Sequence, residues 1–392
     1  MTSGDEASIL KAQKRQQLGR DWVKVLILSC NTGQGHNTAG RAVLEELRRQ
    51  GVPCEMKDVL LFAGQRTSRV VSNAYVKITT RSPLVFQWLY RAGEAIRSDR
   101  LHSPVYFANT LYADNLLRYI EGQGFDRVLT PHLFAAEALT SLRRRGKLAA
   151  RCYGIATDYT CIPFWEETEL DAYFIPHRDL MEEFAQKGLP REKLAATGIP
   201  VSRRFSHPGD REAARAALGI GPDSQVCLVM TGSMGFGRAG EYAQALLERG
   251  GDRRHVYLFG GRNERLKAEL RERFAGEPRA VVLDYTDQVP LYMDGCDLLL
   301  TKPGGLTSTE AAVHRIPLIH TAPIPGCETQ NAAFFSNRGM SLCPDGPEET
   351  AEAAEGLLGD PARREAMAAA QAANCNPRAA EEIVRRMAED DL

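Results

Sequence analysis

The sequence lacks the paired cysteines that a disulfide framework or a zinc site requires. Nine cysteines occur among its 392 residues, and all of them stand singly, without a CxxC pair. An odd number of scattered cysteines predicts reduced thiols in a cytoplasmic protein, most of them acting as small core residues. We therefore expect neither a disulfide framework nor a bound metal.

Long apolar runs and an excess of charge of one sign are also absent. No stretch approaches the roughly 20 apolar residues of a membrane-spanning helix, and the polar N-terminus predicts no signal peptide. The formal net charge is −1, so no overall field favours nucleic acid or a membrane. We expect no nucleic-acid partner, and any membrane contact must be peripheral and use a local patch.

What is present is an alternation of apolar runs and amphipathic segments in two successive series. A chain of 392 residues with 43% hydrophobic and 25% charged residues suits a soluble protein of two domains. The apolar runs predict strands at 24–29, 54–60, 125–132, 151–158, 171–177 and 193–205, and then at 224–230, 255–260, 280–287, 296–301 and 317–322. Strands alternating with helices predict an α/β fold with two Rossmann-like domains built on parallel sheets.

The boundary between the two series lies near 201–212, where the Pro-Gly-Asp sequence at 208–210 precedes a restart of the pattern. The predicted domains are 1–205 and 206–375, followed by an amphipathic helix at 376–392. Glycine turns follow predicted strands in both series, at 33–35, 232–237, 260–261 and 304–305. Because ligands of open α/β sheets bind at the carboxyl ends of the strands, these turns predict a site in a cleft between facing domains.

The turn at 301–312 has the character of an anion site. Gly304 and Gly305 permit close approach of the backbone, and Leu306 and Thr307 would present free N–H groups at a helix N-terminus. Glu310, one helical turn further on, is placed to bind ribose hydroxyls. The alternative is an ordinary N-capped helix in which Thr307 and Glu310 form a capping box.

Two further loops are candidates for donor binding. The loop at 231–237, which contains Gly232 and Ser233, lacks the full GxGxxG spacing and the lysine of a P-loop. Its backbone donors can face a phosphate or a sugar, or it is only a flexible turn. At the next loop, Glu328, Gln330 and Asn331 either contact the hydroxyls of a hexose or cap a helix.

Two titratable residues follow strands of the first series. His36 and the preceding Gly35 lie where a helix begins, and the positive helix end would lower the pKa of the imidazole and keep it neutral. A neutral histidine at a cleft edge can act as a general base, although a lone histidine also caps or packs beside a turn. Asp158 either orients the base or an acceptor hydroxyl, or caps the next segment.

The segment 62–100 mixes basic residues with apolar and aromatic ones and contains only two acidic residues. Its candidates for contact with an anionic lipid surface or a lipid acceptor are Tyr75, Arg81, Phe86, Trp88 and Tyr90. The alternative is that the aromatic residues belong to the core and the arginines to a solvated face.

Taken together and in this order, the motifs resemble one enzyme family. The stretches LILSCNTGQGHNTAGRAVLEEL, ITTRSPLVFQWLY, TDY, TGIPVS, TGSMGFG and TKPGGLTSTEA are similar to those of monogalactosyldiacylglycerol synthases and processive diacylglycerol glucosyltransferases. The last motif also resembles the MurG-type transferases. The resemblance covers residues 22–380 and implies a GT-B fold, with a C-terminal helix that crosses back to the first domain.

The resemblance also implies an inverting, metal-independent transfer of a hexose from a UDP-sugar to a lipid, with no cofactor. It places the diphosphate at 301–307, which includes Pro303, the ribose at Glu310 and the uracil near Tyr285 and Val289. It implies an enzyme of the cytoplasm that binds the membrane peripherally, with diacylglycerol as the acceptor.

The sequence departs from many relatives at Asn31, where they have aspartate, and at TCIPF (160–164), where they have a histidine, so the acceptor lipid is open. The sequence does not specify which sugar is transferred either. Two rival functions share the fold: a UDP-sugar 2-epimerase and a nucleotide-sugar sensor without activity. The apolar and basic segment 62–100 argues against the epimerase.

Overall fold

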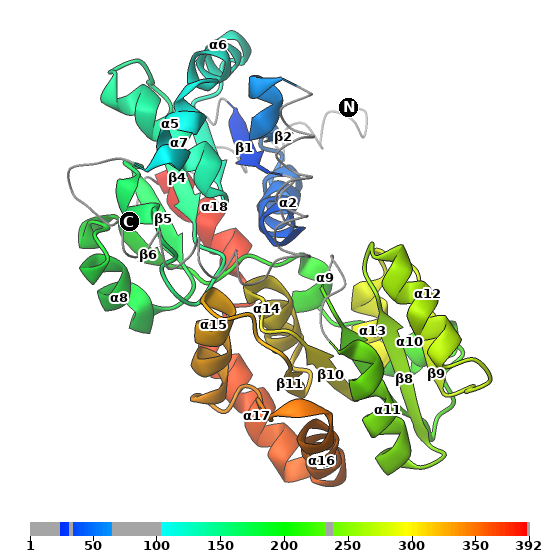
Figure 1. The fold of residues 1–392 in the computed structure, drawn as a ribbon. Coiled ribbons are helices and arrows are strands. Elements are labelled where there is room, and N and C mark those ends of the chain that lie inside the picture. The colour runs from blue at the N-terminus through cyan, green and yellow to red at the C-terminus, as the bar shows by residue number, and fades with distance from the viewer. Residues whose placement is uncertain (1–23, 31–33, 65–102, 233–237, 390–392) are drawn as a thin grey trace, which may run out of the picture.

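We describe the fold from a computed structural model that covers residues 24–30, 34–64, 103–232 and 238–389. Two parallel sheets form the framework, each flanked by helices (Figure 1). The N-terminal half has six strands in the order β2-β1-β3-β4-β5-β6, and the C-terminal half has five in the order β11-β10-β7-β8-β9. The two Rossmann-like sheets are therefore confirmed, and their strands come from the first and second predicted series respectively.

The N-terminal half is built from short, buried strands that alternate with helices. Its strands are β1 (Val25–Ser29), β2 (Cys54–Asp58), β3 (Arg127–Thr130), β4 (Arg151–Ile155), β5 (Ala172–Ile175) and β6 (Leu194–Ala196). Its helices are α2 (Gln34–Arg49), η1 (Val59–Ala63), α5 (Pro104–Thr110), α6 (Ala113–Gln123), α7 (Leu133–Arg144), η2 (Trp165–Glu167), η3 (Arg178–Leu180), α8 (Met181–Gln186) and η4 (Arg191–Lys193).

The C-terminal half repeats this plan. Its strands are β7 (Gln225–Met230), β8 (Arg254–Phe259), β9 (Ala280–Leu283), β10 (Leu298–Thr301) and β11 (Leu318–His320). The helices from the linker to the chain end are α9 (Arg203–Ser206), α10 (Arg211–Ala217), α11 (Ala239–Gly250), α12 (Glu264–Arg273), α13 (Val289–Gly295), α14 (Gly305–His314), α15 (Cys327–Ser336), α16 (Gly346–Gly359), α17 (Pro361–Asn374) and α18 (Ala379–Glu389).

The continuous apolar run of β1 explains its central place in the sheet. Every residue of β1 is buried, and alternate side chains enter different core clusters: Val25 and Ile27 enter one, and Leu26 and Leu28 the other. Burial on both faces is the usual environment of a strand in a parallel sheet. The only polar residue of β1 is Ser29, which lies at the end of the strand that leads toward α2.

Helix α18 returns to the N-terminal half, as predicted. It packs on α2, and its buried residues Ile383 and Met387 belong to the same core cluster as Val25. Arg127 of β3 donates from Nε to the carbonyl oxygen of Met387 at 3.2 Å. Figure 1 shows α18, in red, beside α2 and the first sheet, far from α16 and α17. The chain end therefore ties the two halves together.

Several predicted boundaries were wrong by a few residues. The strand predicted at 54–60 ends at Asp58, because the Asp58 side chain accepts from the N–H of Leu60 and starts the helical turn η1. The long strand predicted at 193–205 is only β6, followed by an extended segment and α9. The helix expected at Gly35 and His36 begins at Gln34, which places His36 inside its first turn.

Candidate active site

The candidate site lies where the first turn of α2 and the loop after β4 meet the loop after β10 and helix α15. Tyr159 forms the centre of this contact between the halves: its hydroxyl lies 2.9 Å from Thr309 Oγ1 of α14. The Tyr159 ring also packs against Phe334 and Phe335 of α15, at centroid distances of 4.6 and 4.9 Å. The carboxyl ends of the two sheets therefore share one region, as the glycine turns predicted.

His36 lies in the first turn of α2, and its ring is held from the N-terminal half. Nδ1 lies 2.9 Å from the carbonyl oxygen of Pro131 and 3.1 Å from Thr157 Oγ1. A carbonyl oxygen can only accept, so Nδ1 carries the proton, and Nε2 of the neutral ring is left as the acceptor. This tautomer is the one that a general base needs when Nε2 faces the reacting hydroxyl.

Burial lowers the pKa of His36, and the negative charge of Asp158 partly opposes that effect. The prediction that the histidine is neutral therefore has a different main cause, desolvation, from the helix end that we expected. A second histidine, His132, lies with its ring centroid 4.7 Å from that of His36, and burial lowers the pKa of His132 well below its usual value. From the sequence we predicted no role at His36 for Pro131, Thr157 or His132. These residues follow β3 and β4, and only the fold brings them to the His36 ring.

Asp158 lies at the end of the β4 loop, between the halves. Its Oδ1 accepts a hydrogen bond of 2.8 Å from Asn331 Nδ2 of α15. Burial raises the pKa of Asp158, whereas the Asn331 hydrogen bond and the charge of His36 favour its ionised form. Asp158 and His36 thus stabilise each other's charged state, which suits a carboxylate that supports an imidazolium.

The N-terminus of α14 lies directly against the N-terminal half. A Cβ atom at Gly305 would lie 1.9 Å from the carbonyl oxygen of Thr157, so only glycine fits there. A Cβ atom at Gly35, one residue before His36, would lie 3.6 Å from the side chain of Leu306. Gly304–Thr307 is therefore adjacent to the turn that carries His36.

This packing changes the interpretation of three residues. Gly305 is required by the opposite half of the protein, whereas a Cβ at Gly304 would meet nothing within 4 Å. The side chain of Leu306 is buried, which leaves its backbone N–H as the group that can bind an anion. The alternative capping box was wrong: Gly304 is the N-cap residue of α14, so Thr307 stands at the third helical position.

Glu310 is buried on α14, five residues after Gly305. Burial raises the pKa of Glu310 to about 8, and no ion pair is recorded for it among the described residues. Its carboxyl group is therefore protonated at neutral pH, and it can both donate to and accept from a hydroxyl. That capacity suits the role at the ribose that the resemblance implies.

Replacing Glu310 with glutamine should stabilise the protein as the pH rises from about 5 to about 8. The folded protein holds the carboxyl proton up to about pH 8, whereas the unfolded chain releases it near its ordinary value of 4.5, so the wild type loses stability in this window. We expect a difference of a few kcal/mol at most between the two proteins at about pH 8. Urea unfolding at a series of pH values measures it. Glu348→Gln, at an exposed position, keeps Glu310 and should lose stability with pH as the wild type does. Equal slopes for wild type and Glu310→Gln would contradict the assignment.

The glycine loop after β7 lies next to Lys302. Gly232 has a φ of 75°, and a Cβ there would lie 2.9 Å from Lys302 Cε, so both backbone and space favour glycine. Lys302 Nζ pairs with Glu328 Oε1, and the other oxygen, Oε2, accepts from the N–H of Ile324 at 3.0 Å. Both oxygens of Glu328 therefore bind protein groups, and Lys302 is a site residue to which the sequence reasoning gave no role of its own.

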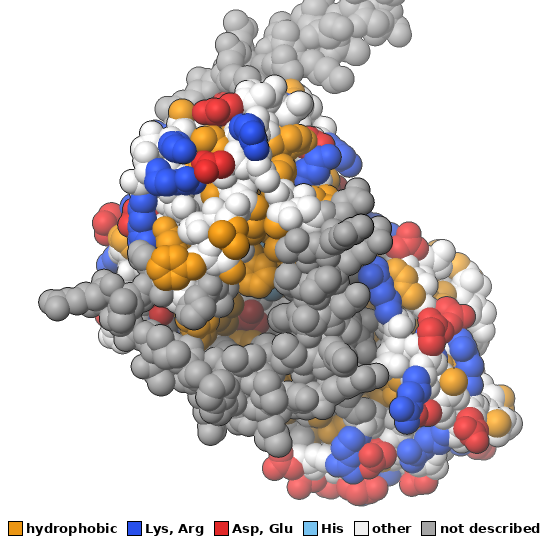
Figure 2. All heavy atoms as spheres, turned by 45° about the horizontal axis from the view of Figure 1, so that its top comes forward, with side chains coloured by type: hydrophobic (Ala, Val, Ile, Leu, Met, Phe, Trp, Pro, Cys, Tyr) orange, Lys and Arg blue, Asp and Glu red, His pale blue; other side chains and the backbone are white. Residues whose placement is uncertain are grey.

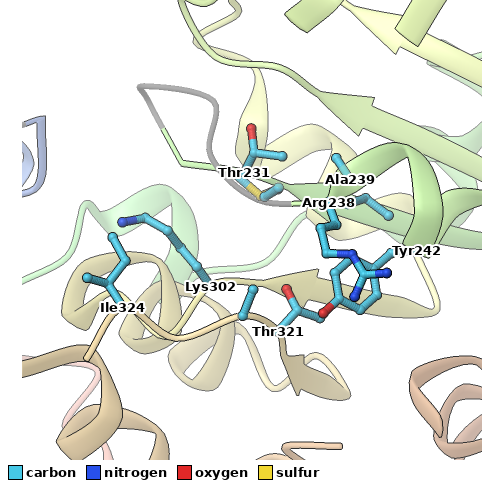
Figure 3. Close-up of a pocket in the computed structure, with 10 residues that line it drawn as sticks. Thr231, Arg238, Ala239, Tyr242, Lys302, Thr321 and Ile324 are labelled. Carbon is cyan, nitrogen blue, oxygen red and sulfur yellow. The ribbon is translucent and has the colours of Figure 1, made fainter. Parts of the chain in front are cut away.

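A pocket opens beside this loop at the carboxyl end of the second sheet (Figure 3). Lys302 and Arg238 lie on opposite sides of it, with Thr231 and Thr321 between them. The complete lining is Val229, Met230, Thr231, Arg238, Ala239, Tyr242, Lys302, Thr321, Ala322 and Ile324. The side chains that border this pocket thus include two cations, each paired with a carboxylate, and the hydroxyl groups of Thr231, Thr321 and Tyr242, among apolar residues.

The remaining predicted donor residues lie further out. Tyr285 follows β9 and is 53% exposed, with the Arg262 guanidinium 4.8 Å from its ring centroid, and Val289 begins α13. Gln330 is exposed on α15. Asn331 is fully buried, and its amide binds protein groups, so it is not placed to touch a sugar as predicted.

Six of the predicted residues lie outside the described part of the chain: Ser233, Tyr75, Arg81, Phe86, Trp88 and Tyr90. Within residues 24–30, 34–64, 103–232 and 238–389, no cluster of three or more His, Cys, Asp or Glu side chains suits a metal ion. None of the helices in these ranges combines the length and the apolar character of a membrane span.

The chain is similar to a known family and to curated proteins. The family described as monogalactosyldiacylglycerol (MGDG) synthase matches residues 36–201. A processive diacylglycerol beta-glucosyltransferase of Staphylococcus saprophyticus is 26% identical over 348 residues, which are 88% of this chain and 87% of that protein. One of the same description from Bacillus cereus is 26% identical over 368 residues, or 92% of each chain.

Solved structures show which fold the two sheets form. MurG of Acinetobacter baumannii superimposes with a TM-score of 0.59 at 16% identity, covering 94% of this chain and 99% of that one. The UDP complex of S. aureus MnaA reaches a TM-score of 0.63 at 11% identity, covering 94% and 97%. At such identities the likeness establishes the GT-B fold alone, and a fold does not determine a reaction. The chain therefore has the GT-B fold, and its sequence is similar to the monogalactosyldiacylglycerol synthase family over residues 36–201 and to processive diacylglycerol beta-glucosyltransferases over most of its length.

Proposed function

We propose that this protein is a hexosyltransferase that moves a hexose from a UDP-sugar to the hydroxyl group of a lipid, with diacylglycerol as the first candidate acceptor. The observation that carries the proposal is the approach of the His36 turn to the N-terminus of α14, with the Gly35 position 3.6 Å from Leu306. This arrangement brings a base from one half to an anion-binding helix end of the other. The named activity of the relatives, which match over most of the chain, supports the same reaction.

The acceptor side of the reaction uses His36 and Asp158. Nε2 of His36 accepts the proton of the lipid hydroxyl while its oxygen attacks C1 of the sugar from the face opposite the diphosphate, which inverts the anomeric centre. The protonated imidazole is then stabilised by the Asp158 carboxylate, whose charge already favours it in the free protein. Pro131 and Thr157 keep the ring in the required tautomer.

The donor side stabilises the departing diphosphate without a metal ion. The N–H groups of Gly305, Leu306 and Thr307 occupy the first three positions of α14, where a helix has unpaired donors and a positive dipole end. Lys302 precedes them and adds a positive charge. Preorganised donors of this kind stabilise charge that develops in the transition state. Glu310 binds the ribose, and the uracil lies near Tyr285 and Val289.

The pocket beside Gly232 is the candidate location for the hexose. Lys302, which is paired with Glu328, borders both this pocket and the N-terminus of α14, so a sugar attached to the diphosphate can reach it. Thr231 and Thr321 supply hydroxyl groups for the hydroxyls of the sugar. Glucose, galactose and N-acetylglucosamine are the three candidates for the transferred sugar.

An apolar surface on the N-terminal half suits a membrane-bound acceptor. Leu61, Phe107 and Leu111 are exposed by 47, 58 and 87%. They come from η1, α5 and the residue after α5, and α6 contacts both η1 and α5. Figure 2 shows hydrophobic side chains on this half, with basic and acidic groups close by. Apolar anchors beside cations favour peripheral binding to an anionic membrane, which we place at the cytoplasmic face.

Replacing Phe107 and Leu111 together with glutamate should reduce binding to anionic vesicles by about tenfold or more, because two exposed apolar anchors become negative charges that the anionic lipid surface repels. Vesicle flotation measures the bound fraction. The matched control is Ala275→Glu, which adds a negative charge at an exposed position near the end of α12 in the C-terminal half. Equal binding by the double variant and the wild type would remove this surface from the account.

The proposed activity is tested by incubating the protein with UDP-glucose, UDP-galactose or UDP-N-acetylglucosamine and diacylglycerol vesicles, followed by mass spectrometry of the lipids. We expect one sugar to yield a hexosyl lipid. Conversion of the UDP-sugar into its 2-epimer would instead favour the epimerase, with which this chain shares its fold. UDP-sugar binding without any product would favour a sensor.

A further inference from the structure

Asn331 of α15 makes three hydrogen bonds, two of which join the two halves of the protein. Its Nδ2 donates to Asp158 Oδ1 at 2.8 Å and to the carbonyl oxygen of Pro303 at 3.0 Å. Its Oδ1 accepts from the backbone N–H of Tyr159 at 2.6 Å. The side chain is fully buried. A single amide thus contacts the loop that carries Asp158 and the loop that precedes α14.

The chemistry of the partners fixes the orientation of this amide. A carboxylate and a carbonyl oxygen can only accept, and a backbone N–H can only donate, so a flipped amide would oppose its partners at all three contacts. Both N–H groups of Asn331 are used by protein atoms. No N–H group is left to recognise a sugar hydroxyl, which is the role that the sequence suggested.

We infer that Asn331 is a positioning residue, which holds the carboxylate of Asp158 beside His36 when the two halves are closed on each other. This inference rests on the proposed transfer reaction. The partner Asp158 has no other recorded hydrogen bond among the described residues, so its carboxylate depends on Asn331 for its direction. The charged and titratable groups that act on Asp158 are His36, Glu328 and Lys302. The first of these belongs to the same half as Asp158, whereas Lys302 lines the donor pocket and Glu328 pairs with Lys302.

Asn331 acts on the donor loop through the same amide. Its bond to Pro303 fixes the residue immediately before Gly304, the N-cap of α14. The distance between base and leaving group therefore depends on a side chain that touches neither. A displacement of about 1 Å between reacting groups can lower a rate by about 100-fold, so loss of this amide should appear in kcat.

The test is a double-mutant cycle with Asn331→Ala, Asp158→Ala and the combined variant, measured by kcat and KM for the UDP-sugar and by UDP binding. We expect Asn331→Ala to lower kcat by about 100-fold while the Kd for UDP changes by less than about threefold. The combined variant should lose less kcat than the product of the two single losses, because both substitutions remove the orientation of Asp158 and only the bond to Pro303 is lost in addition. Losses that multiply, or an effect confined to KM for the UDP-sugar, would overturn the inference in favour of a sugar contact.

The pH profile provides a readout that a purely structural role would not move. Because the charge of Asp158 raises the pKa of His36, the acid limb of kcat should move to lower pH in Asn331→Ala, as in Asp158→Ala. Asp158→Asn is a useful comparison, since it keeps the accepting oxygen for Asn331 and removes only the charge. An acid limb that stays in place in Asn331→Ala but moves in Asp158→Ala would contradict the inference.

Two results distinguish the failure of this inference from that of the proposed function. If the wild type transfers no sugar from any UDP-sugar, the proposed function fails and the inference falls with it. If the wild type is active and the cycle is multiplicative, only the inference fails. Asn331→Asp, of nearly the same volume, replaces Asn331→Ala if the latter does not fold. In Asn331→Asp, an oxygen atom replaces the Nδ2 that donates to Asp158 and Pro303. This variant should therefore give the same loss of kcat.

Discussion

Replacing His36 with glutamine should lower kcat for sugar transfer by about 1,000-fold, within the range typical of a lost general base. Glutamine keeps the volume and polarity of the position but cannot accept the hydroxyl proton. UDP binding should stay within about twofold of the wild type, because the donor groups belong to the C-terminal half. Steady-state kinetics and calorimetry with UDP measure the two quantities.

The matched control for this variant is His207→Gln, at an exposed position after α9. It should keep the wild-type kcat. In the wild type, burial lowers the pKa of His36, so kcat should fall only below about pH 6.5, where the ring becomes protonated. A variant lacking His36 that retains more than about a tenth of the wild-type kcat would show that another group takes the proton.

Replacing Gly305 with alanine should separate the two halves at the site and lower kcat by at least about 100-fold. The new methyl carbon would lie 1.9 Å from the carbonyl oxygen of Thr157, well inside any allowed contact. Since backbone lies on both sides, no flexible side chain can move to relieve the clash. Activity measurements and hydrogen exchange of residues 157–160 test this, with faster exchange expected in the variant.

Gly304→Ala is the matched structural control for this prediction. A Cβ there would meet nothing within 4 Å, and its φ of −75° is accessible to alanine. Hydrogen exchange of 157–160 and the melting temperature should therefore stay as in the wild type. If Gly305→Ala left both exchange and activity unchanged, the close contact between α14 and the β4 loop would not exist in solution.

Local sequence patterns predicted much of the fold and part of the site. Buried strands such as β1 consist almost wholly of apolar residues, and parallel sheets place the loops after them at one edge, so His36, Asp158 and Gly304 were found from their positions alone. The sequence predicted that the last segment is an amphipathic helix, and the resemblance implied that this helix returns to the N-terminal half. The resemblance supplied the GT-B arrangement.

Contacts between distant segments could not be predicted in this way. Asn331 appeared to be a sugar ligand because it stands at the start of a helix, but its partner Asp158 lies 173 residues away in the sequence. Gly305 appeared to serve a ligand, although the atom that requires it is the carbonyl oxygen of Thr157. The cause of the lowered pKa of His36 likewise depends on burial by other segments. Local periodicity carries no information on these pairings.

The most direct test of the account is the stereochemistry of the product formed from an α-linked UDP-hexose and diacylglycerol in the presence of a metal chelator. A base on one face of the sugar and a helix-bound diphosphate on the other require a single displacement. The account therefore predicts a β-linked hexosyl lipid, identified from the coupling of its anomeric proton in the NMR spectrum, at an unchanged rate with chelator. An α-linked product, or a reaction that stops when divalent cations are removed, would contradict it.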